Sequence, residues 1–362
     1  MAPTVTEASK AWKRIRGATP RAQGYTWPAE WSKHEATVIA WPHDPKTWPD
    51  CVPEAEQVFT QLATAVGTGE IVHVLVKDAE IEARARQHMA DAGASSRVQL
   101  HRVPTADSWL RDTGPIVVAR GRGASRERLA LDFRFDAWGG KYETLMADDD
   151  LPPRLKKVLG LPTKRIELTL EGGSIDGDGQ GTILTTEQCL LNRNRNPDLT
   201  RAEIEWHLRE ALGAKTVLWL GAGIEGDDTD GHVDDITRFV APGVVVTVVQ
   251  DDTTNPDHAP LDDNLRRLKA MEDARGRALE VVTLPMPEPV MGSDGRPLPA
   301  SHANFLIANK VVCVPVFGQR SDSVACKRLA RLFPTRRIVP IRCDRFVEGM
   351  GALHCVTQQI PA

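Results

Sequence analysis

Four short segments of the chain combine residue types that could bind and attack a planar cation. They are Trp109-Leu-Arg-Asp112, Glu171-Gly-Gly173, Gly231-His-Val-Asp234 and Gly351-Ala-Leu-His-Cys355. Asp112, Glu171, Asp234, His232 and Cys355 in these segments supply three carboxylates, a histidine and a thiol. A thiol with a histidine indicates covalent catalysis through sulfur, whereas three acids around that thiol would be poor surroundings for an ester or a phosphate. The pattern therefore favours a guanidinium group as the molecule that binds here.

Cys355 is the candidate nucleophile. A single cysteine is more often a small buried hydrophobic residue, but Gly349 and Gly351 give the backbone at this point the freedom to approach a ligand closely. His232 taken alone would more often be structural. Strand alternation, however, sends His232 and Asp234 to the same face, which places a proton shuttle beside a carboxylate.

The other candidates have competing structural interpretations. Asp112 lies in the turn-rich segment Arg111-Asp-Thr-Gly-Pro115, where an aspartate is equally expected to form the turn itself. Glu171 precedes two glycines at a strand end and has no evident capping role there, which favours an inward carboxylate. Trp109 is more often a core residue, although an aromatic face beside a guanidinium adds cation–π attraction.

Two further acidic segments have to be interpreted. Asp227, Asp228 and Asp230 form either a solvated loop or, because they adjoin His232, part of the site. The segment 176–187 resembles a calcium loop, with oxygens near positions one, three, five and twelve and glycine at six. An EF-hand needs flanking helices, whereas β-branched runs lie on both sides here, so a hairpin turn is favoured. We expect no metal and no cofactor.

The elements that must position these residues recur in the order hairpin, helix, strand. The clearest unit has strand-like runs at 236–240 and 244–249, a helix at 261–275 and a strand at 279–284. Similar units cover 304–341, 171–220 and 115–170, whereas 36–103 fits less neatly. In the second of these, Thr200-Arg-Ala-Glu203 is a capping box that predicts a helix start. About five units of roughly 60 to 70 residues therefore span the chain.

The reactive residues occupy equivalent places in this repeat. Asp112, Glu171, His232 with Asp234, and Cys355 each follow the last strand of one unit. If the units pack around an axis as blades do, these joints meet at one central mouth. The sequence thus predicts an α/β fold, a pseudo-symmetric propeller with a central active site.

Composition excludes several classes of function. The 362 residues carry a net charge of −4 with no basic stripe, which argues against nucleic acid and membrane surfaces as partners. Residues 1–24 lack a continuous apolar core, so we expect a poorly ordered lead-in rather than a signal peptide, followed by a single catalytic domain over 25–362. No later segment is apolar enough to span a bilayer. The six cysteines form no Cys-x-x-Cys pair, which favours free thiols in the cytoplasm.

With these residues assembled, the chain resembles the agmatine deiminases and the related bacterial peptidylarginine deiminase-like group of the guanidine-modifying superfamily. The likeness covers nearly everything after about residue 24. It rests on the order and spread of Trp27-Pro-Ala-Glu-Trp31, His34-Glu35, Ala40-Trp-Pro42, Arg111-Asp-Thr-Gly-Pro115, Trp138-Gly-Gly-Lys-Tyr142, Glu171-Gly-Gly-Ser174, Leu184-Thr-Thr-Glu187, Asn194-Arg-Asn-Pro197, Gly231-His-Val-Asp234 and His354-Cys-Val-Thr-Gln-Gln359.

The resemblance implies a five-bladed, pentein-like α/β propeller and a cofactor-free hydrolase. The implied reaction converts agmatine to N-carbamoylputrescine and ammonia, a step of putrescine biosynthesis in polyamine metabolism. By motif match, Cys355 is implied as the nucleophile that forms an S-alkylthiouronium, and His232 as general acid and base. Asp112 and Asp234 are implied as guanidinium clamps, and Glu171 as a carboxylate near His232 and the substrate.

Two departures bear on substrate preference. Ala352 stands where family members commonly have Asn, and the acidic loop reads Asp228-Thr-Asp230-Gly where Thr-Asn-Gly is usual. Agmatine carries a second cation, which Asp228 or its neighbours Asp227 and Asp230 would receive. Free arginine would instead need a cation for its carboxylate, and Arg193 and Arg195 are candidates, although a structural role for Arg195 is equally expected.

Other functions remain open on the sequence alone. The substrate could be arginine, peptidyl-arginine or a methylated arginine, and an amidinotransferase would share the propeller and the cysteine chemistry. A thiol peptidase would need a Cys-bearing helix N-terminus or a similar signature, which Cys355 lacks. The non-enzymatic alternative is a calcium-binding β protein. The expected partner is a small cationic guanidino compound, and the oligomeric state is open, with a homo-oligomer among the outcomes.

Overall fold

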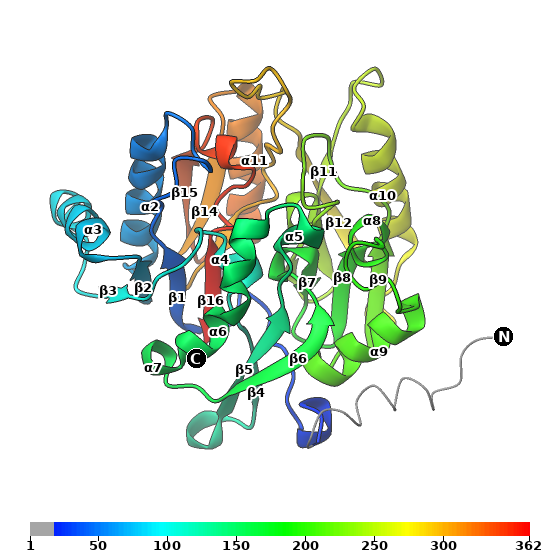
Figure 1. The fold of residues 1–362 in the computed structure, drawn as a ribbon. Helices are drawn as coiled ribbons and strands as arrows, with labels where there is room; N and C mark the ends of the chain where they lie inside the picture. Colours follow the sequence, from blue (N-terminus) through cyan, green and yellow to red (C-terminus); the bar gives the residue numbers. More distant parts are fainter. Residues whose placement is uncertain (1–17) are drawn as a thin grey trace.

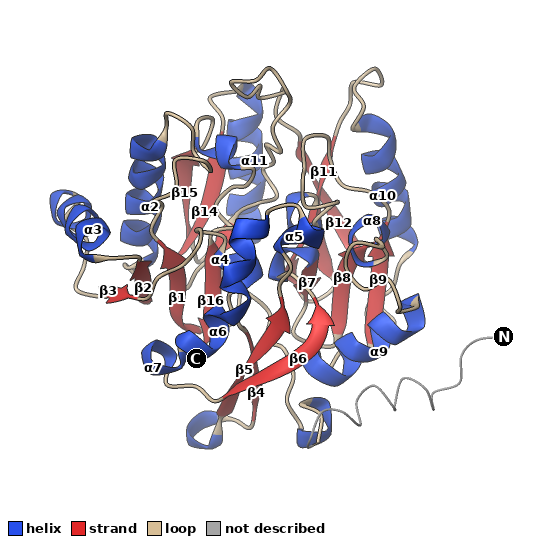
Figure 2. Ribbon diagram, in the orientation of Figure 1, coloured by secondary structure: helices blue, strands red, loops and turns tan. Residues whose placement is uncertain are grey.

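The structure, a computed structural model, describes residues 18–362. Its strands form five small sheets, with the long helices on the outside of the molecule (Figure 1 and Figure 2). In four sheets the first strand pairs antiparallel with the second, and the second pairs parallel with the third. These sheets are β4 (Ile116–Arg120), β5 (Glu127–Arg134) and β6 (Thr163–Thr169); β7 (Ile175–Gly177), β8 (Thr182–Thr186) and β9 (Thr216–Leu220); β10 (Thr237–Ala241), β11 (Val244–Val249) and β12 (Glu280–Pro285); and β13 (Leu306–Ile307), β14 (Val311–Val316) and β15 (Arg337–Arg342).

Helical crossovers join the parallel strands, because two parallel strands cannot be linked by a tight turn. The β5–β6 crossover contains four short helices, and the β8–β9 crossover contains two. A single helix joins β11 to β12, and another joins β14 to β15. In chain order they are α5 (Ala137–Gly140), η3 (Glu143–Asp150), α6 (Leu151–Arg154), α7 (Lys156–Leu159), α8 (Glu187–Leu190), α9 (Arg201–Leu212), α10 (His258–Ala270) and α11 (Arg320–Leu332).

Both ends of the described chain contribute to the fifth unit. The C-terminal strand β16 (Thr357–Pro361) pairs antiparallel with β1 (His34–Ala40), which pairs parallel with β2 (Ile71–Val76) across helix α2 (Val52–Val66). Figure 1 shows the blue strand β1 beside the red strand β16. The unit is therefore complete only when the chain closes on itself, and the predicted five-bladed α/β propeller is confirmed.

An additional helix and strand explain why the N-terminal segment fits the repeat poorly. Helix α3 (Ala79–Asp91) and strand β3 (Val98–Arg102) follow β2, and β3 extends the sheet formed by β16, β1 and β2. Asp78 caps α3 by accepting hydrogen bonds from the amides of Glu80 and Ile81. The antiparallel strand that the repeat requires comes from 357–361, far from this segment in sequence.

Local sequence accounts for the helix boundaries. In α2, Ala55, Phe59, Leu62 and Val66 are almost fully buried at a spacing of three to four residues, so one face covers the sheets. The predicted capping box of Thr200 and Glu203 begins α9, and both of its hydrogen bonds are present. Helix α10 ends at Ala270 rather than at 275, because the carboxylate of Asp273 accepts amides of Arg275 and Arg277 and closes a turn.

The calcium-like segment is a hairpin turn, as predicted. It joins β7 to β8, and Asp178 closes it by accepting the amides of Gln180 and Thr182 at 2.7 and 2.9 Å. Asp176 is ion-paired with Arg238. The acids of this loop are thus occupied by donors of the chain itself.

The predicted N-terminal lead-in lies largely in residues 1–17, outside the described residues. Within 18–24 the chain forms the 3-10 turn η1 (Arg21–Gln23), and Thr19 donates a hydrogen bond to Glu210 of α9 at 2.6 Å. The other 3-10 turns are η2 (Gly123–Ser125), η4 (Gly172–Ser174), η5 (Val233–Asp235) and η6 (Phe346–Gly349), and helix α4 (Leu110–Thr113) precedes β4. Over residues 18–362, none of the helices has the length and apolar character needed to cross a membrane.

Candidate active site

The connections from one unit to the next bring the reactive side chains together. Asp112 lies just before β4, Glu171 before β7, His232 and Asp234 before β10, and Cys355 before β16. Asp112 Oδ1 lies 3.9 Å from His232 Nδ1, and the Cys355 sulfur lies 3.8 Å from Asp234 Oδ2. The convergence of the joints that the repeat predicts is therefore present in the structure.

Cys355 is held between η6 and β16 by a tightly packed backbone. A Cβ atom at Gly351 would lie 2.6 Å from Trp109 Cζ3 and 3.2 Å from the Cys355 Cβ, so only glycine fits here. The Cys355 side chain is 7% exposed and lines the cavity described below. Trp109 lines the same cavity, and its Nε1 donates to Asp107 Oδ2 at 2.9 Å, which fixes the indole.

Asn304 is a site residue that sequence reasoning missed. Its Nδ2 donates to the Cys355 sulfur at 2.9 Å and to Asp235 Oδ1 at 2.8 Å. Its Oδ1 accepts the amide of His354 at 2.9 Å. Asn304 lies just before β13, which is the one joint to which no reactive residue had been assigned. The repeat itself was therefore the signal that could have identified it.

Asp112 receives one hydrogen bond on each oxygen. The amide of Gly173 donates to Oδ1 at 2.9 Å, and Trp138 Nε1 donates to Oδ2 at 3.1 Å. A Cβ at Gly173 would lie 2.6 Å from His232 Nδ1, which explains the second of the two glycines that follow Glu171. Trp138 lies in a left-handed turn in which Ala137 and Trp138 both have φ of 56°. Such a conformation is costly for residues with a Cβ and is typical of functional sites.

Asp234 is fixed from behind by a chain of buried charges. His354 Nδ1 lies 2.6 Å from Asp234 Oδ2, and His354 Nε2 lies 2.8 Å from Glu30 Oε2. Glu30 is in turn ion-paired with Arg238. Asp234 Oδ1 has no hydrogen-bond partner although it is fully buried. One oxygen is thus anchored and the other is left available.

His354 and Glu30 were also missed as functional positions. Both lie in segments that carried the family resemblance, but they are 324 residues apart and nothing in the sequence pairs them. Burial opposes ionisation of Asp234, yet the hydrogen bond and charge of His354 keep the pKa of Asp234 below its usual value.

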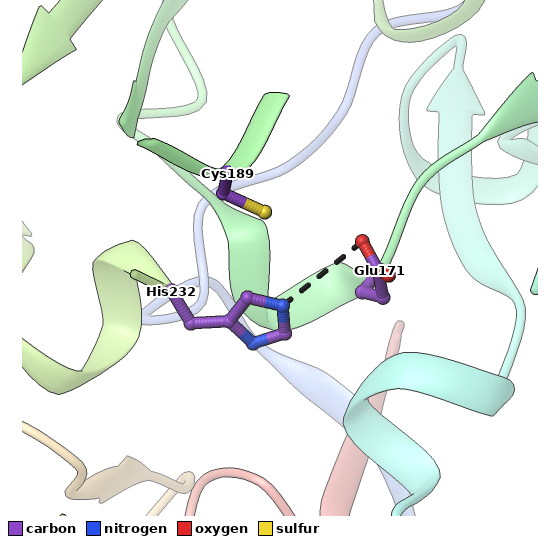
Figure 3. Close-up of side chains that lie close together, drawn as sticks. All are labelled: Glu171, Cys189 and His232. Carbon is purple, nitrogen blue, oxygen red and sulfur yellow. Dashed lines mark ion pairs between the residues drawn. The ribbon is translucent and has the colours of Figure 1, made fainter. Parts of the chain in front are cut away.

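The two ring nitrogens of His232 face different groups. Nδ1 faces Asp112, whereas Nε2 lies 4.0 Å from Glu171 Oε2 on the other side of the ring, as Figure 3 shows. Glu171 Oε1 is paired with Arg195 Nε at 2.5 Å, and both side chains are fully buried. Glu171 therefore lies behind the imidazole rather than beside the Cys355 sulfur.

Electrostatics set the protonation states that the site favours. Burial alone would lower the pKa of His232, but Asp112, Cys189 and Glu171 raise it well above its usual value. Burial raises the pKa of the Cys355 thiol well above its usual value, and Asp234 adds to the effect. Burial likewise raises the pKa of Asp112 to about 6. At neutral pH the empty site therefore holds a cationic imidazole and a neutral thiol.

Cys355 lines a cavity of about 490 Å³. Its lining includes Trp109, Asp112, Trp138, Asp228 and Cys355. The volume is that of a pocket for a small molecule. Asp234, His232 and Glu171 adjoin this lining and are at most 1% exposed.

The three acids of the 227–230 loop are used differently. Asp228 lines the cavity, and its carboxylate accepts a hydrogen bond from the Tyr142 hydroxyl. Asp227 accepts the amides of Thr229, Gly231 and His232, so it shapes the loop itself. Neither Asp227 nor Asp230 is among the residues that line the cavity.

Asp230 and the two arginines considered for substrate binding have other surroundings. Asp230 is paired with Lys141 at 2.8 Å and with Arg195 at 2.9 Å. Arg195 is therefore fully engaged by Glu171 and Asp230, which agrees with its structural interpretation. Arg193 is exposed.

Two groups of described side chains have donor atoms close enough to hold a metal ion. One contains Glu171, Cys189 and His232, and the other contains Asp234, Asp235 and Cys355. Neither group lies in the segment that resembled a calcium loop. Cys189 is one of the six cysteines expected to be free thiols, and the sequence assigned it no role in the site.

Comparison with known proteins agrees with this geometry. The family described as "Porphyromonas-type peptidyl-arginine deiminase" matches residues 26–361. Agmatine deiminase of Ectopseudomonas mendocina is 39% identical over an alignment that covers 95% of this chain and 97% of that protein. Agmatine deiminase of Enterococcus faecalis superposes with a TM-score of 0.89 at 34% identity, covering 96% of this chain and 98% of the other.

A cysteine-to-serine variant of C. jejuni agmatine deiminase, solved with substrate bound, is similar with a TM-score of 0.83 at 29% identity. The superposition covers 93% of this chain and 96% of that one. The matches extend over the joints, the cavity and both ends of the closed propeller. The chain belongs to the Porphyromonas-type peptidyl-arginine deiminase family.

Proposed function

We propose that this protein hydrolyses agmatine to N-carbamoylputrescine and ammonia. The observation that carries the proposal is one small cavity whose lining contains Cys355 and Asp112 together with further carboxylates, among them Asp228 of the 227–230 loop. Agmatine has a guanidinium at one end and an ammonium at the other, so it complements both Asp112 and Asp228. The similarity to agmatine deiminases at 39% and 34% identity supports the same assignment.

Asp112 and Asp234 bind the guanidinium in this mechanism. Carboxylates form charge-assisted, two-point hydrogen bonds with a planar guanidinium, which fix its plane as well as its position. Asp234 Oδ1 has no hydrogen-bond partner within the described chain and is therefore free to accept such a bond. Because Asp234 Oδ2 lies 3.8 Å from the Cys355 sulfur, the guanidinium carbon would be held against the nucleophile.

The first half of the reaction forms a bond between sulfur and carbon. The Cys355 thiolate attacks the central carbon and gives a tetrahedral adduct. Cationic His232 protonates one terminal nitrogen, the bond from carbon to that nitrogen breaks, and ammonia leaves. An S-alkylthiouronium on Cys355 remains, and His232 is then neutral. The ring nitrogen Nδ1, which faces Asp112, is the one placed to transfer this proton.

The second half restores the enzyme. Neutral His232 takes a proton from water, the resulting hydroxide attacks the thiouronium carbon, and the bond between sulfur and carbon breaks. The hydroxyl oxygen of this adduct becomes the carbonyl oxygen of the ureido product, its proton passes to solvent, where the released ammonia takes it up, and Cys355 leaves as the thiolate. Glu171, behind the ring, holds the imidazole in orientation through both halves.

The raised pKa of Cys355 implies that substrate helps to ionise its own nucleophile. A bound guanidinium offsets the negative charge of Asp234 and Asp112, which favours the thiolate. Alkylation of Cys355 by a neutral reagent, followed against pH, should therefore show a lower apparent pKa when a non-reactive amidine analogue is bound. An unchanged pKa would contradict substrate-assisted ionisation.

A substrate panel tests the proposed function. Agmatine, arginine, peptidyl-arginine and methylated arginines are compared for release of ammonia and ureido product, without any acceptor amine. Agmatine should have the highest kcat/KM, by about 100-fold over arginine, because a carboxylate near Asp228 would be repelled. Cys355→Ala should release no ammonia. Preferred turnover of an arginine derivative would reject the substrate assignment, and a requirement for an acceptor amine would indicate an amidinotransferase.

A further inference from the structure

A second thiol lies on the far side of the catalytic imidazole. Cys189 belongs to the short helix α8 that follows β8, and its side chain is fully buried. The proposed mechanism gives it no role. Thr186 caps the N-terminus of α8, and its hydroxyl accepts the Cys189 amide at 3.1 Å, which fixes the position of Cys189.

Cys189, His232 and Glu171 direct three different donor atoms toward a common space. The sulfur, a ring nitrogen and a carboxylate oxygen all lie within 4.8 Å of one another. Figure 3 shows the Cys189 sulfur facing the gap between the imidazole and the carboxylate. Glu171 Oε2 and His232 Nε2 are buried and have no hydrogen-bond partner. These two atoms and the Cys189 sulfur therefore offer three donors to the same small space.

The three donors match the preferences of a borderline-soft divalent cation. Zinc binds thiolate sulfur at ~2.3 Å and imidazole nitrogen and carboxylate oxygen at ~2.0–2.2 Å, usually with four ligands. Tetrahedral angles at those lengths put neighbouring donors roughly 3.3–3.6 Å apart. The Nε2–Oε2 separation is 4.0 Å, so a small inward movement of these side chains would complete the coordination.

The charges around the three donors also suit a cation. A thiolate and a carboxylate together balance a divalent ion. Arg195 is bonded to Glu171 Oε1 at 2.5 Å, which leaves Oε2 free and fixes its direction, as outer partners of metal ligands do. We propose that Cys189, His232 and Glu171 form a binding site for zinc or a similar thiophilic divalent cation, with a fourth position open to water.

The other candidate group does not carry the same inference. Asp234, Asp235 and Cys355 also offer donor atoms within 4.8 Å of one another, but apart from Asp234 Oδ1 the contacts of these residues are already made. Asn304 donates to both the Cys355 sulfur and Asp235 Oδ1, and His354 is bonded to Asp234 Oδ2. A metal at that place would have to displace these contacts, whereas the Cys189 group has unused donors.

Binding at this site would inhibit the reaction, and this consequence rests on the proposed function. A metal on His232 Nε2 leaves the proton of the neutral ring on Nδ1, so the imidazole cannot take a proton from water. Glu171 would at the same time be removed from its orienting role. Because all three side chains are buried, entry requires local opening, and inhibition should develop slowly and be reversed by a chelator.

Cadmium, a spectroscopic substitute for zinc, tests the site without any turnover. The full-length protein is titrated with Cd²⁺ and the ultraviolet charge-transfer absorption of the bond between thiolate and cadmium is recorded. We expect one cadmium per chain, an unchanged absorption band in Cys355→Ser and in Cys326→Ser, and loss of the band in Cys189→Ser. The affinity for cadmium should fall at least about 100-fold in Cys189→Ser, as expected when a first ligand is lost.

Two further variants test whether the cadmium site depends on Cys189 and Glu171. Cys189→Ala and Glu171→Gln should also lose affinity for cadmium. Thermal unfolding of each variant checks that it is folded. If Cys189→Ser fails to fold, these two variants replace it in the test. A band that persists without Cys189, a band that disappears in Cys355→Ser, or no cadmium binding would overturn the proposal. If agmatine proves not to be the substrate but the band depends on Cys189, the metal site stands and the proposed function fails.

Discussion

Carboxylates lie close together in two regions of this protein, the strand joints and the 227–230 loop. The two regions differ in how fully the carboxylate oxygens are hydrogen-bonded. At the strand joints, Glu171 and Asp234 each keep one buried oxygen without a hydrogen-bond partner. In the 227–230 loop, Asp227 accepts three backbone amides and Asp230 is paired with two cations. A buried polar atom without a partner is costly. The difference indicates that Glu171 and Asp234 each keep one oxygen ready for a ligand, whereas Asp227 and Asp230 hold the loop that carries His232.

The largest difference in activity is expected between a variant of a strand-joint carboxylate and a variant of a carboxylate in the 227–230 loop. Asp234→Asn removes a charge that is proposed to bind the guanidinium, and kcat/KM for agmatine should fall about 10³-fold, the order expected when one partner of a buried charge pair is lost. The matched variant Asp230→Asn keeps its shape and most of its contacts, and the loss should stay below about tenfold. Steady-state ammonia release measures both. Equal losses would mean that the two regions do not differ as described.

Acid pH should affect the joint region before the loop. Burial raises the pKa of Asp112 to about 6, so this carboxylate becomes neutral as pH falls through that value and its attraction for a guanidinium is lost. Burial opposes ionisation of Asp230, but bonds from Asn194, Lys141 and Arg195 lower its pKa, so it remains charged. His232, whose pKa is raised, is already protonated.

The expected profile of kcat/KM for agmatine therefore falls with decreasing pH below about 6, approaching tenfold per pH unit. Over two units this amounts to roughly a hundredfold loss. Circular dichroism at each pH checks that the fold persists. A rate that stays level down to pH 4.5 or so would show that no carboxylate with a raised pKa takes part in binding.

Loss of Asp227 should act on stability. Asp227→Ala leaves the amides of Thr229, Gly231 and His232 without an acceptor, and the free energy of unfolding should decrease by about 2 kcal/mol. Asp262→Ala, at an exposed position on α10, should change it by less than about 0.5 kcal/mol. Urea unfolding followed by fluorescence compares the two. If Asp227→Ala were as stable as Asp262→Ala, the loop would not depend on this carboxylate.

Asp228 is the loop acid that lines the cavity, and its substitution should affect substrate binding only moderately. Asp228→Asn weakens the contact with the distal ammonium, and KM for agmatine should rise about tenfold, the scale of a partly exposed ion pair with a hydrogen bond. KM for an alkylguanidine without a second cation should be unchanged. A similar rise for both compounds would assign Asp228 a structural role like that of its neighbours.

The repeat and its joints could be predicted because they depend on local sequence patterns. Strand runs, the hairpin signals and the capping box of Thr200 and Glu203 depend on residues close in sequence. The placement of Cys355, His232 and Glu171 at equivalent joints followed from that periodicity. The end of α10 was predicted five residues too late, because the turn formed by Asp273 and Arg277 competes with the helix.

The contacts missed from sequence depend on closure of the propeller. The pairing of β16 with β1 and the bond between His354 and Glu30 join opposite ends of the chain. Asn304 has no charge or special reactivity, so its type gave no signal, although its joint did. The partners of the acidic loop, Lys141 and Arg195, come from other units, and no local pattern distinguishes Asp228 from Asp227 and Asp230.

Trapping of the covalent intermediate tests the central claim most directly. The protein is mixed with agmatine, quenched in acid within the first turnovers, and analysed by intact-mass and peptide mass spectrometry. The account predicts an adduct equal in mass to agmatine minus ammonia on the peptide that carries Cys355, absent in Cys355→Ala, which should also release no ammonia. Ammonia release by Cys355→Ala at the rate of the unmodified protein, or an adduct on another cysteine, would contradict it.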